Sequence, residues 1–276
     1  MRLGTIRHDG RTVAVRDEGE AVVLLDAPDV GTLLATDDWA ERAATHDGPR
    51  LPAAGLTFDA PVPQPGAVFC VGLNYRTHIE ESGEQVPAYP TLFGKLARTL
   101  IGPHDDIQLP AGEDRLVDWE AELVVVVGRA VRHADPATAA AAIAGFTVGN
   151  DISVRDYQRR TSQWLQGKCF EATTPVGPWL RTVDETGPAP DLAISCAVDG
   201  DVKQASRTSD LLFGPAELVG YLSRIVTLRP GDLIFTGTPG GVGQSRTPAE
   251  FLHAGSIVET TIEGIGSLRN TCVPAA

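Results

Sequence analysis

The sequence predicts a β-rich α+β protein, in which a roll or barrel-like main domain follows a small N-terminal α/β domain. Three observations predict it. From residue 67 onward, apolar runs of strand length outnumber helical patterns. Before that point, Pro61, Pro63 and Pro65 form a stretch that is typical of a linker. With 276 residues, 42% of them hydrophobic, the chain can bury a sizeable core, and we place the domains at residues 1–62 and 63–276.

The N-terminal segment contains two short apolar runs, residues 12–15 and 21–25, bordered by Asp-Gly and Glu-Gly turns. These runs predict the strands of a small hairpin unit. Residues 29–47 are rich in Ala, Leu and Asp, and they predict one or two helices.

The main domain contains a series of strand-like runs and two clear helical segments. The alanine-rich segment 134–144 predicts a helix, with Asp135 as its N-cap and Pro136 in its first turn. A second helix is predicted over Pro215–Ile225. The predicted strands are Val68–Gly72, 123–127, Ala193–Val198, 232–236 and Ile257–Ile262.

Three carboxylates border predicted strands. Glu120 and Glu122 stand at the start of a valine run, and residues two apart in a strand point the same way. Two neighbouring buried carboxylates repel, so either one is protonated or a cation lies between them, unless both simply reach solvent at the strand end. Asp151 follows the strand-like segment 144–150. The three side chains together predict an oxygen-rich site for Mg²⁺ or Mn²⁺, with Ca²⁺ as an alternative, that leaves positions for water or substrate.

A second candidate feature is the pair His78 and Glu81, which are neighbours if they lie on a helical turn. A carboxylate beside an imidazole raises its basicity and fixes its tautomer, as a water-activating base requires. The alternative is a surface pair without a catalytic role, which is common on helices.

Composition excludes several classes of protein. The formal net charge of −13 argues against nucleic-acid binding, which needs fields of Lys and Arg. The four cysteines form no CxxC pair, so we expect neither a zinc finger nor a disulfide scaffold but reduced, mostly buried thiols. No apolar run is long enough to span a membrane, and we expect a cytoplasmic protein without a membrane partner.

An ordered set of motifs runs from residue 67 to residue 272. The first half contains Gly72-Leu73-Asn74-Tyr75-x-x-His78-x-x-Glu81, Phe93-x-Lys95, Asp118-Trp119-Glu120-x-Glu122-Leu123, Asn150-Asp151-x-x-x-Arg155-Asp156-x-Gln158 and Gly167-Lys168-x-Phe170. The second half contains Pro175-x-Gly177-Pro178, Pro230-Gly231-Asp232, Thr236-Gly237-Thr238-Pro239 and Glu263-Gly264-Ile265-Gly266. In this order the motifs resemble the fumarylacetoacetate hydrolase superfamily, in particular its bacterial two-domain acylpyruvate hydrolases and 2-hydroxyhepta-2,4-diene-1,7-dioate isomerases.

The resemblance implies a mixed β-sandwich roll, a homodimer and a set of site residues. It implies Mg²⁺ or Mn²⁺ bound by Glu120, Glu122 and Asp151. It implies that His78 and Glu81 form a water-activating dyad on a lid, and that Lys168 steadies developing negative charge. The implied substrate contacts are Tyr75, Arg155, Gln158 and Thr238. One departure is that the longest members of the family have a fourth metal carboxylate upstream of the histidine, where this chain has only Asn74 nearby.

The expected reaction is metal-dependent hydrolysis of a C–C bond in a 1,3-diketo acid such as an acylpyruvate, in the catabolism of aromatic compounds. Alternatives are decarboxylation of an oxaloacetate-like acid, isomerisation or hydration of an unsaturated 2-oxo diacid, and a metal-stabilised binding module without turnover. For single residues, structural roles also stay open: Lys168 in an ion pair, Arg155 and Asp156 paired with neighbours, and residues 236–243 as a tight turn.

Overall fold

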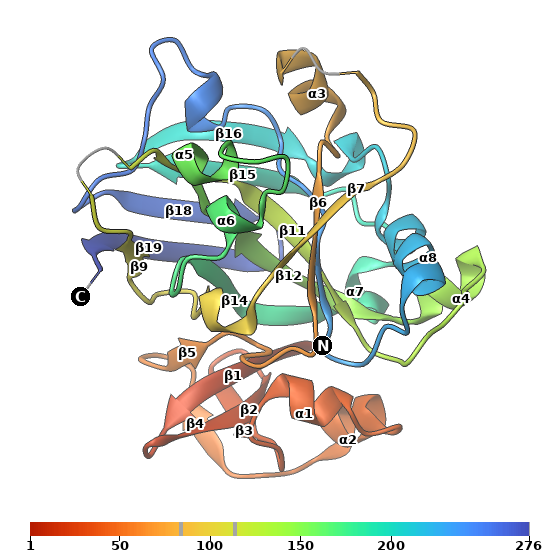
Figure 1. The fold of residues 1–276 in the computed structure, drawn as a ribbon. Helices are drawn as coiled ribbons and strands as arrows, with labels where there is room; N and C mark the ends of the chain where they lie inside the picture. The colour runs from red at the N-terminus through yellow and green to blue at the C-terminus, as the bar shows by residue number, and fades with distance from the viewer. Residues whose placement is uncertain (83–84, 113–114, 276) are drawn as a thin grey trace.

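The fold was analysed in a computed structural model that describes residues 1–82, 85–112 and 115–275, without the side chains of His78 and Ser82. Two mixed sheets dominate it, with short helices around them (Figure 1). The large sheet runs in the order β4-β3-β2-β1-β14-β12-β11-β17-β6-β7, and the smaller one in the order β16-β15-β18-β19-β9. The predicted β-rich fold with few helices is confirmed.

The strands of the large sheet come from both ends of the chain. They are β1 (Arg2–His8), β2 (Arg11–Asp17), β3 (Ala21–Leu24), β4 (Arg50–Pro52), β5 (Thr57–Asp59), β6 (Val68–Gly72), β7 (Thr91–Lys95), β8 (Leu100–Ile101), β11 (Ala121–Val127), β12 (Ile143–Asn150), β14 (Thr174–Thr182) and β17 (Leu233–Phe235). The smaller sheet consists of β9 (Ile107–Leu109), β15 (Ala193–Val198), β16 (Asp201–Arg207), β18 (Ile257–Ile262) and β19 (Gly266–Pro274). A short pair, β10 (Val117–Asp118) and β13 (Ser153–Val154), lies beside the site described below.

The helices are short. They are α1 (Val30–Leu34), α2 (Trp39–Thr45), α3 (Arg76–Ser82), α4 (Pro136–Ala141), α5 (Arg155–Gln158), α6 (Leu165–Lys168), α7 (Val183–Thr186) and α8 (Pro215–Ile225). None of the helices in the described ranges is long and apolar enough to cross a membrane.

The valine run of β11 is buried on both faces, as predicted, and the two-residue period divides it between two cores. Leu123, Val125 and Val127 pack against residues of the smaller sheet. Val124 and Val126 face the other way, into a core shared with α1 and the N-terminal strands. Because both faces are filled, β11 is a rigid element from which side chains at its start can be positioned.

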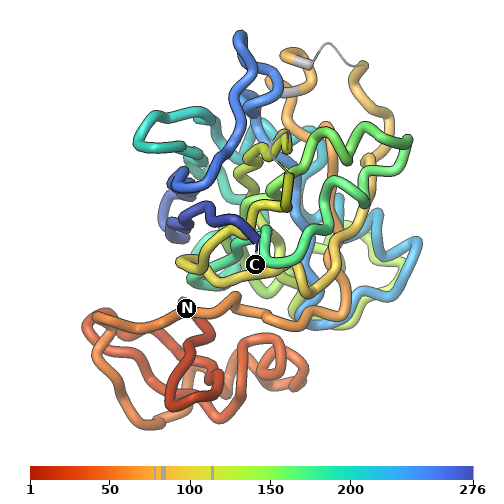
Figure 2. Tube along the Cα trace, turned by 60° about the vertical axis from the view of Figure 1, so that its left-hand side comes forward, coloured from red at the N-terminus to blue at the C-terminus, as the bar shows by residue number. Residues whose placement is uncertain are grey.

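The N-terminal segment extends the large sheet. β1 pairs antiparallel with β14, with Leu3 opposite Leu180, and the strands β2 to β4 follow outward. In Figures 1 and 2 this segment, in red and orange, forms a lobe at the lower end of the molecule, which includes the outer strands of the large sheet. The predicted hairpin strands and helices are all present, and the domain boundary at residue 62 stays a prediction.

The predicted helix over 134–144 is wrong in its extent. Asp135 does cap it, accepting a hydrogen bond from the Thr138 N–H at 2.8 Å, but α4 ends at Ala141. Ile143 already pairs with Val127 at the start of β12. Pairing with the central strand outweighs the helix propensity of the remaining alanines.

The predicted thiols are free cysteines in the structure. Cys70, Cys196 and Cys272 are buried, and Cys169 is half-buried. Burial raises the pKa of Cys196 and of Cys272 to about 12, so both are neutral thiols at physiological pH.

Candidate active site

The three predicted carboxylates meet because β11 and β12 are antiparallel neighbours. Glu122 pairs with Gly149, and Ala121 pairs with Asn150. One residue further out, the Asp151 N–H donates to the Glu120 carbonyl at 2.8 Å. One carboxylate oxygen from each of the three acids lies within 4.8 Å of the others. All three acids are buried, and Glu120 is the most accessible at 7% exposure.

Two lysines neutralise part of this negative charge. The Lys168 Nζ lies 2.6 Å from the Glu120 Oε2 and 2.8 Å from the Asp151 Oδ2. The Lys95 Nζ lies 2.5 Å from the other Asp151 oxygen. Burial alone would lower the pKa of Lys168, but Asp151 and Glu120 outweigh it, so the pKa is raised and the ammonium stays charged.

Glu122 is the acid whose charge is least compensated. The Gly237 N–H donates to its Oε2 at 2.6 Å. Burial, followed by the charges of Asp151 and Glu120, raises the pKa of Glu122 well above its usual value. The Glu122 side chain is therefore either protonated or accompanied by a cation.

A buried aspartate, Asp118, organises the next part of the site. Its Oδ1 accepts from the Gly243 N–H at 2.7 Å, and its Oδ2 accepts from the Gln244 N–H at 3.1 Å. The same Oδ2 accepts from the Arg155 Nε at 2.8 Å. Arg155 then reaches Glu120, with 2.7 Å between its Nη1 and the Glu120 Oε1. Asp118 thus joins η3 (Gly243–Ser245) to the carboxylate cluster.

The donor set fits a hard divalent cation. With every group charged, the described cluster sets four acids against three bases and so carries one uncompensated negative charge. The acids are Asp118, Glu120, Glu122 and Asp151, and the bases are Lys95, Arg155 and Lys168. Carboxylate oxygens are the ligands that Mg²⁺ and Mn²⁺ prefer. Such an ion would satisfy Glu122 and leave the cluster with one net positive charge, which suits an anionic substrate.

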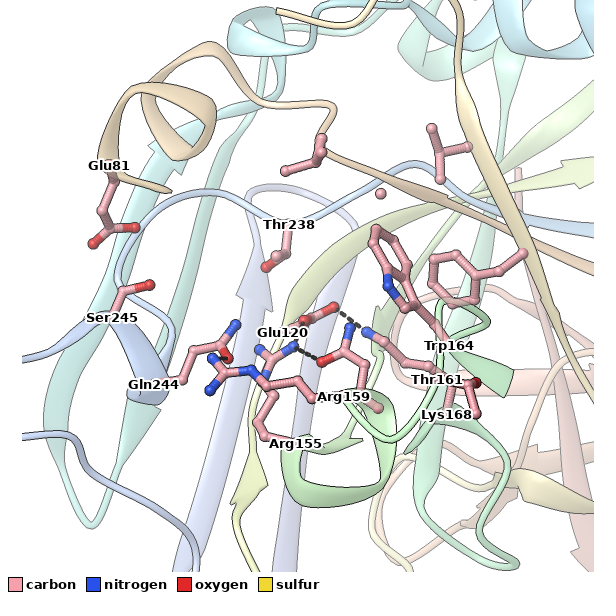
Figure 3. A pocket seen from close by; sticks show the side chains of 15 residues that line it. Glu81, Glu120, Arg155, Arg159, Thr161, Trp164, Lys168, Thr238, Gln244 and Ser245 are labelled. Carbon is pink, nitrogen blue, oxygen red and sulfur yellow. Dashed lines mark hydrogen bonds and ion pairs between the residues drawn. The ribbon is translucent and has the colours of Figure 1, made fainter. Parts of the chain in front are cut away.

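A pocket of about 570 Å³ opens onto the cluster through Glu120 (Figure 3). Basic, acidic and aromatic side chains share its wall. The lining residues are Val71, Gly72, Leu73, Glu81, Phe93, Glu120, Arg155, Gln158, Arg159, Thr161, Trp164, Lys168, Thr238, Gln244 and Ser245. Trp164 packs edge-on against Phe93, with ring centroids 5.5 Å apart, and forms an apolar side of the pocket.

The predicted pair His78 and Glu81 lies on α3, the helical turn that the prediction required. The side chain of His78 is outside the described part of the structure. Glu81 lies on the pocket wall and accepts from the Gly241 N–H, with 3.1 Å to its Oε2. Its carboxylate is therefore held at the pocket by the loop that follows β17.

The structure brings three of the four predicted substrate contacts to the pocket. Arg155, Gln158 and Thr238 line it. The Thr238 hydroxyl accepts from the Gln204 Nε2 at 2.8 Å, and the Gln158 Oε1 accepts from the Arg155 Nη1 at 2.9 Å. Both polar groups are thus fixed in orientation by protein partners.

Tyr75 and Asn74 occupy structural positions. Tyr75 is fully buried in the core, and it is not one of the described residues that line the pocket. Asn74 donates to the carbonyls of Thr236 and Phe213 and accepts from the Phe213 N–H at 2.8 Å. Asn74 therefore joins two loops near the site, a role that the motif alone did not reveal.

The ion pairs that the sequence analysis offered as structural roles for Lys168, Arg155 and Asp156 are present in the structure. Lys168 and Arg155 are both ion-paired, but their partners are the cluster acids themselves. Asp156 pairs with Arg115, away from the cluster.

Several pocket residues were not predicted from the sequence. Arg159 and Gln244 bond each other on the wall, and Trp164 forms part of its apolar side. Lys95 lies behind the pocket, where its ammonium contacts Asp151. The one available signal was the spacing of Arg159, four residues after Arg155 at the turn of α5.

The chain is similar in sequence to one family of known proteins. Residues 67–273 match the family model described as "Fumarylacetoacetate (FAA) hydrolase C-terminal". The chain is 43% identical over 235 residues to oxaloacetate tautomerase Fahd2a, mitochondrial, of Rattus norvegicus. The aligned residues make up 85% of this chain and 75% of the rat protein.

Solved structures with the same fold include two enzymes of different names. The 2-hydroxyhepta-2,4-diene-1,7-dioate isomerase from Mycobacterium marinum is 34% identical, with a TM-score of 0.81 and coverage of 99% of this chain and 98% of that chain. The maleylpyruvate hydrolase from Sphingobium sp. SYK-6, solved in complex with manganese (II) ion and pyruvate, is 25% identical, with a TM-score of 0.81 and full coverage of both chains. The relatives thus carry the names of a tautomerase, an isomerase and a hydrolase.

Proposed function

Because the chain belongs to the fumarylacetoacetate hydrolase family, we propose that it is a divalent-metal-dependent enzyme that interconverts the keto and enol forms of a short 2-oxo acid. Oxaloacetate is the first candidate substrate, since the rat relative is named an oxaloacetate tautomerase. The observation that carries the proposal is the buried trio of carboxylates, which opens through Glu120 into a pocket with a basic wall.

Glu120, Glu122 and Asp151 would hold the Mg²⁺ or Mn²⁺. A bound ion of this kind would supply Lewis-acid polarisation of the substrate's 2-oxo group. The acids' own geometry supports this assignment, since one oxygen of each lies within 4.8 Å of the others, and burial with the charges of Asp151 and Glu120 raises the pKa of Glu122.

The protein's basic groups would bind and orient the acid. The Arg155 side chain is 2% exposed, and its Nη2 has no hydrogen-bond partner among the described atoms. A buried N–H without a partner is costly, so a substrate carboxylate oxygen at this position would be strongly favoured. The Lys168 ammonium, fixed by Glu120 and Asp151, would stabilise negative charge that develops on the 2-oxo oxygen.

Tautomerisation moves one proton. The C3–H bond breaks and an O–H bond forms at the 2-oxo oxygen, with no net gain or loss of atoms. We propose that His78 takes and returns the C3 proton and that Glu81, held by the Gly241 N–H, orients the imidazole from the next turn of α3.

The test is the rate at which enol-oxaloacetate disappears, followed by ultraviolet absorbance. With Mg²⁺ or Mn²⁺ the protein should accelerate the conversion, and EDTA should abolish the effect. Glu81→Gln should lower kcat, whereas Glu80→Gln, the neighbouring exposed acid on α3, should not. Absence of acceleration with both ions would refute the proposal.

Hydrolysis of a C–C bond is the second candidate. The maleylpyruvate hydrolase relative and the position of Glu81 on the pocket wall support it. Here His78 would take a proton from water, and the hydroxide would attack the distal carbonyl of an acylpyruvate. The C–C bond to the pyruvate methylene would then break, its electron pair would leave as the pyruvate enolate, and that enolate would take up the proton to give pyruvate beside the second carboxylic acid. Pyruvate release from maleylpyruvate and fumarylpyruvate tests it: His78→Ala should lose this activity, and hydrolysis that survives the substitution would contradict the assignment.

Two further expectations remain proposals. We propose a homodimer and a cytoplasmic location for the protein. Light scattering on the purified chain tests the first, and fractionation of the source cells tests the second.

A further inference from the structure

One basic group on the pocket wall has no role in the site described above. Arg159 lines the pocket, and its Nη2 donates to the Oε1 of Gln244 (Figure 3). Within the described ranges, Arg155 and Lys168 are each paired with acids, but the structure gives Arg159 no acidic partner. Its charge is therefore available to an anionic group in the pocket.

The backbone explains why Arg159 faces the same pocket as Arg155. Arg159 is the C-cap of α5, and its N–H donates to the Arg155 carbonyl at 3.2 Å. Residues four apart on a helical turn lie on one face, so both guanidinium groups project to one side. Arg160, one residue further, points elsewhere: its Cζ lies 3.4 Å from the centroid of the Tyr157 ring.

The position of Arg159 is fixed through Asp118. The Asp118 Oδ2 accepts from the Arg155 Nε and from the Gln244 N–H, so one carboxylate oxygen locates both residues. The Gln244 side chain in turn accepts a hydrogen bond from the Arg159 guanidinium group and positions it. Arg159 is exposed at the outer part of the wall, whereas Glu120 and Lys168 lie buried at the inner end.

We propose that Arg159 is a specificity-determining residue that binds the distal carboxylate of a dicarboxylic 2-oxo acid. The proposal rests on the proposed function, which places the 2-oxo end of the acid near Glu120 and Lys168. A guanidinium presents paired N–H donors that match the two oxygens of a carboxylate, whereas an alkyl end leaves them unused. The neutral Gln244 side chain positions the Arg159 guanidinium group without neutralising its charge.

A matched pair of stable ligands tests the proposal by calorimetry in the presence of Mg²⁺. 2-Oxoglutarate and 2-oxopentanoate have the same length and differ only in the terminal carboxylate. The wild type should bind 2-oxoglutarate more tightly. Arg159→Gln should weaken that binding about 10- to 100-fold, the effect of losing a charge-assisted hydrogen-bonded pair, and leave 2-oxopentanoate unchanged.

Arg160→Gln is the matched control, since it removes a neighbouring arginine that stacks on Tyr157, and it should leave both affinities unchanged. Arg159→Lys should keep part of the preference, because it retains the charge without the fork. An equal loss for both ligands in Arg159→Gln, or the same loss in Arg160→Gln, would overturn the proposal.

Turnover of oxaloacetate by the same preparations separates this inference from the proposed function. If wild-type protein fails to turn over oxaloacetate but Arg159→Gln still abolishes the preference for 2-oxoglutarate, the proposed reaction is wrong and the role of Arg159 stands. If oxaloacetate is turned over and the preference does not depend on Arg159, the inference fails alone.

Discussion

The single residue Lys95 stabilises the folded protein by compensating the buried charge of Asp151. Its side chain is completely buried, and its ammonium contacts the Asp151 Oδ1 while Lys168 contacts the Oδ2. Both oxygens of Asp151 are thus held by ammonium groups. Removing one partner of a buried ion pair leaves the other charge uncompensated, which is far more costly than the loss of a surface pair.

We therefore predict that Lys95→Met lowers the free energy of unfolding by about 3 to 5 kcal/mol in the presence of EDTA. Saturating Mg²⁺ should restore part of the loss, because a cation bound beside Asp151 stabilises only the folded state. Urea denaturation with and without Mg²⁺ measures both effects.

Arg98→Met provides the comparison, because the Arg98 side chain makes an exposed ion pair with Glu171. It should change stability by less than about 1 kcal/mol. Equal effects of the two substitutions would show that Lys95 does not carry the role assigned to it.

At the scale of elements, the contact between β6 and the segment before α6 shapes the pocket. A Cβ added to Gly72 would lie 2.3 Å from the Trp164 Cζ3, so the indole occupies the space that any other residue would need. Trp164 is half-buried and forms the apolar side of the pocket with Phe93. A side chain at position 72 would therefore displace the pocket wall.

We predict that Gly72→Ala weakens binding of a 2-oxo acid because Trp164 is pushed from its place, and that it lowers the free energy of unfolding by about 1 to 3 kcal/mol, the usual range for overpacking. Gly94→Ala on the neighbouring strand β7 is the control, because a Cβ there would lie 3.4 Å from the Val68 carbonyl oxygen, which is tolerable. Calorimetry gives the affinities, and thermal melts show whether each variant folds. Similar affinity in both variants would argue against a binding role for this wall.

At the scale of the whole molecule, an ion-pair network ties the N-terminal lobe to the main sheets. Arg7 on β1 contacts Asp59 at 2.9 Å and grips Asp105 with two hydrogen bonds of 2.6 Å. Burial would raise the pKa of Asp105, but the bonds from Arg7 and from the Gly102 N–H outweigh it and hold the pKa below its usual value. The contact therefore stabilises the protein when Asp105 is ionised.

A lowered pKa in the folded state contributes stability above the unfolded pKa of Asp, about 3.9, which is lost as the pH falls through the folded value. We predict that Arg7→Gln costs about 0.5 to 1 kcal/mol at pH 7, since the pair is partly exposed, and that the difference from wild type shrinks below about pH 4. Urea denaturation at several pH values measures it. A difference that persists at pH 2 to 3 would show that packing, not the ion pair, is responsible.

The sequence predicted what depends on local pattern and failed where distant segments meet. The valine run of β11 and the Asp135 cap were predictable, because burial period and capping are local properties. The early end of α4 was not, because pairing with β11 decides it.

The same distinction holds for the site. The three carboxylates were predicted from their positions at strand ends. The role of Asp118 was not, because the Gly243 and Gln244 N–H groups that bind it come from a loop more than a hundred residues away. Tyr75 was predicted as a substrate contact, but its side chain is buried and is not among the described residues that line the pocket.

Glu120, Glu122 and Asp151 are proposed to bind one divalent cation, and the decisive experiment is calorimetric titration of the EDTA-treated protein with Mg²⁺ and with Mn²⁺. Glu122→Gln is the informative variant, because it removes the least compensated charge and keeps an oxygen that can accept from the Gly237 N–H. We expect one site per chain in the wild type and at least about tenfold weaker binding in the variant, from the loss of one charged ligand. The absence of binding in the wild type, or equal affinity in wild type and variant, would contradict it.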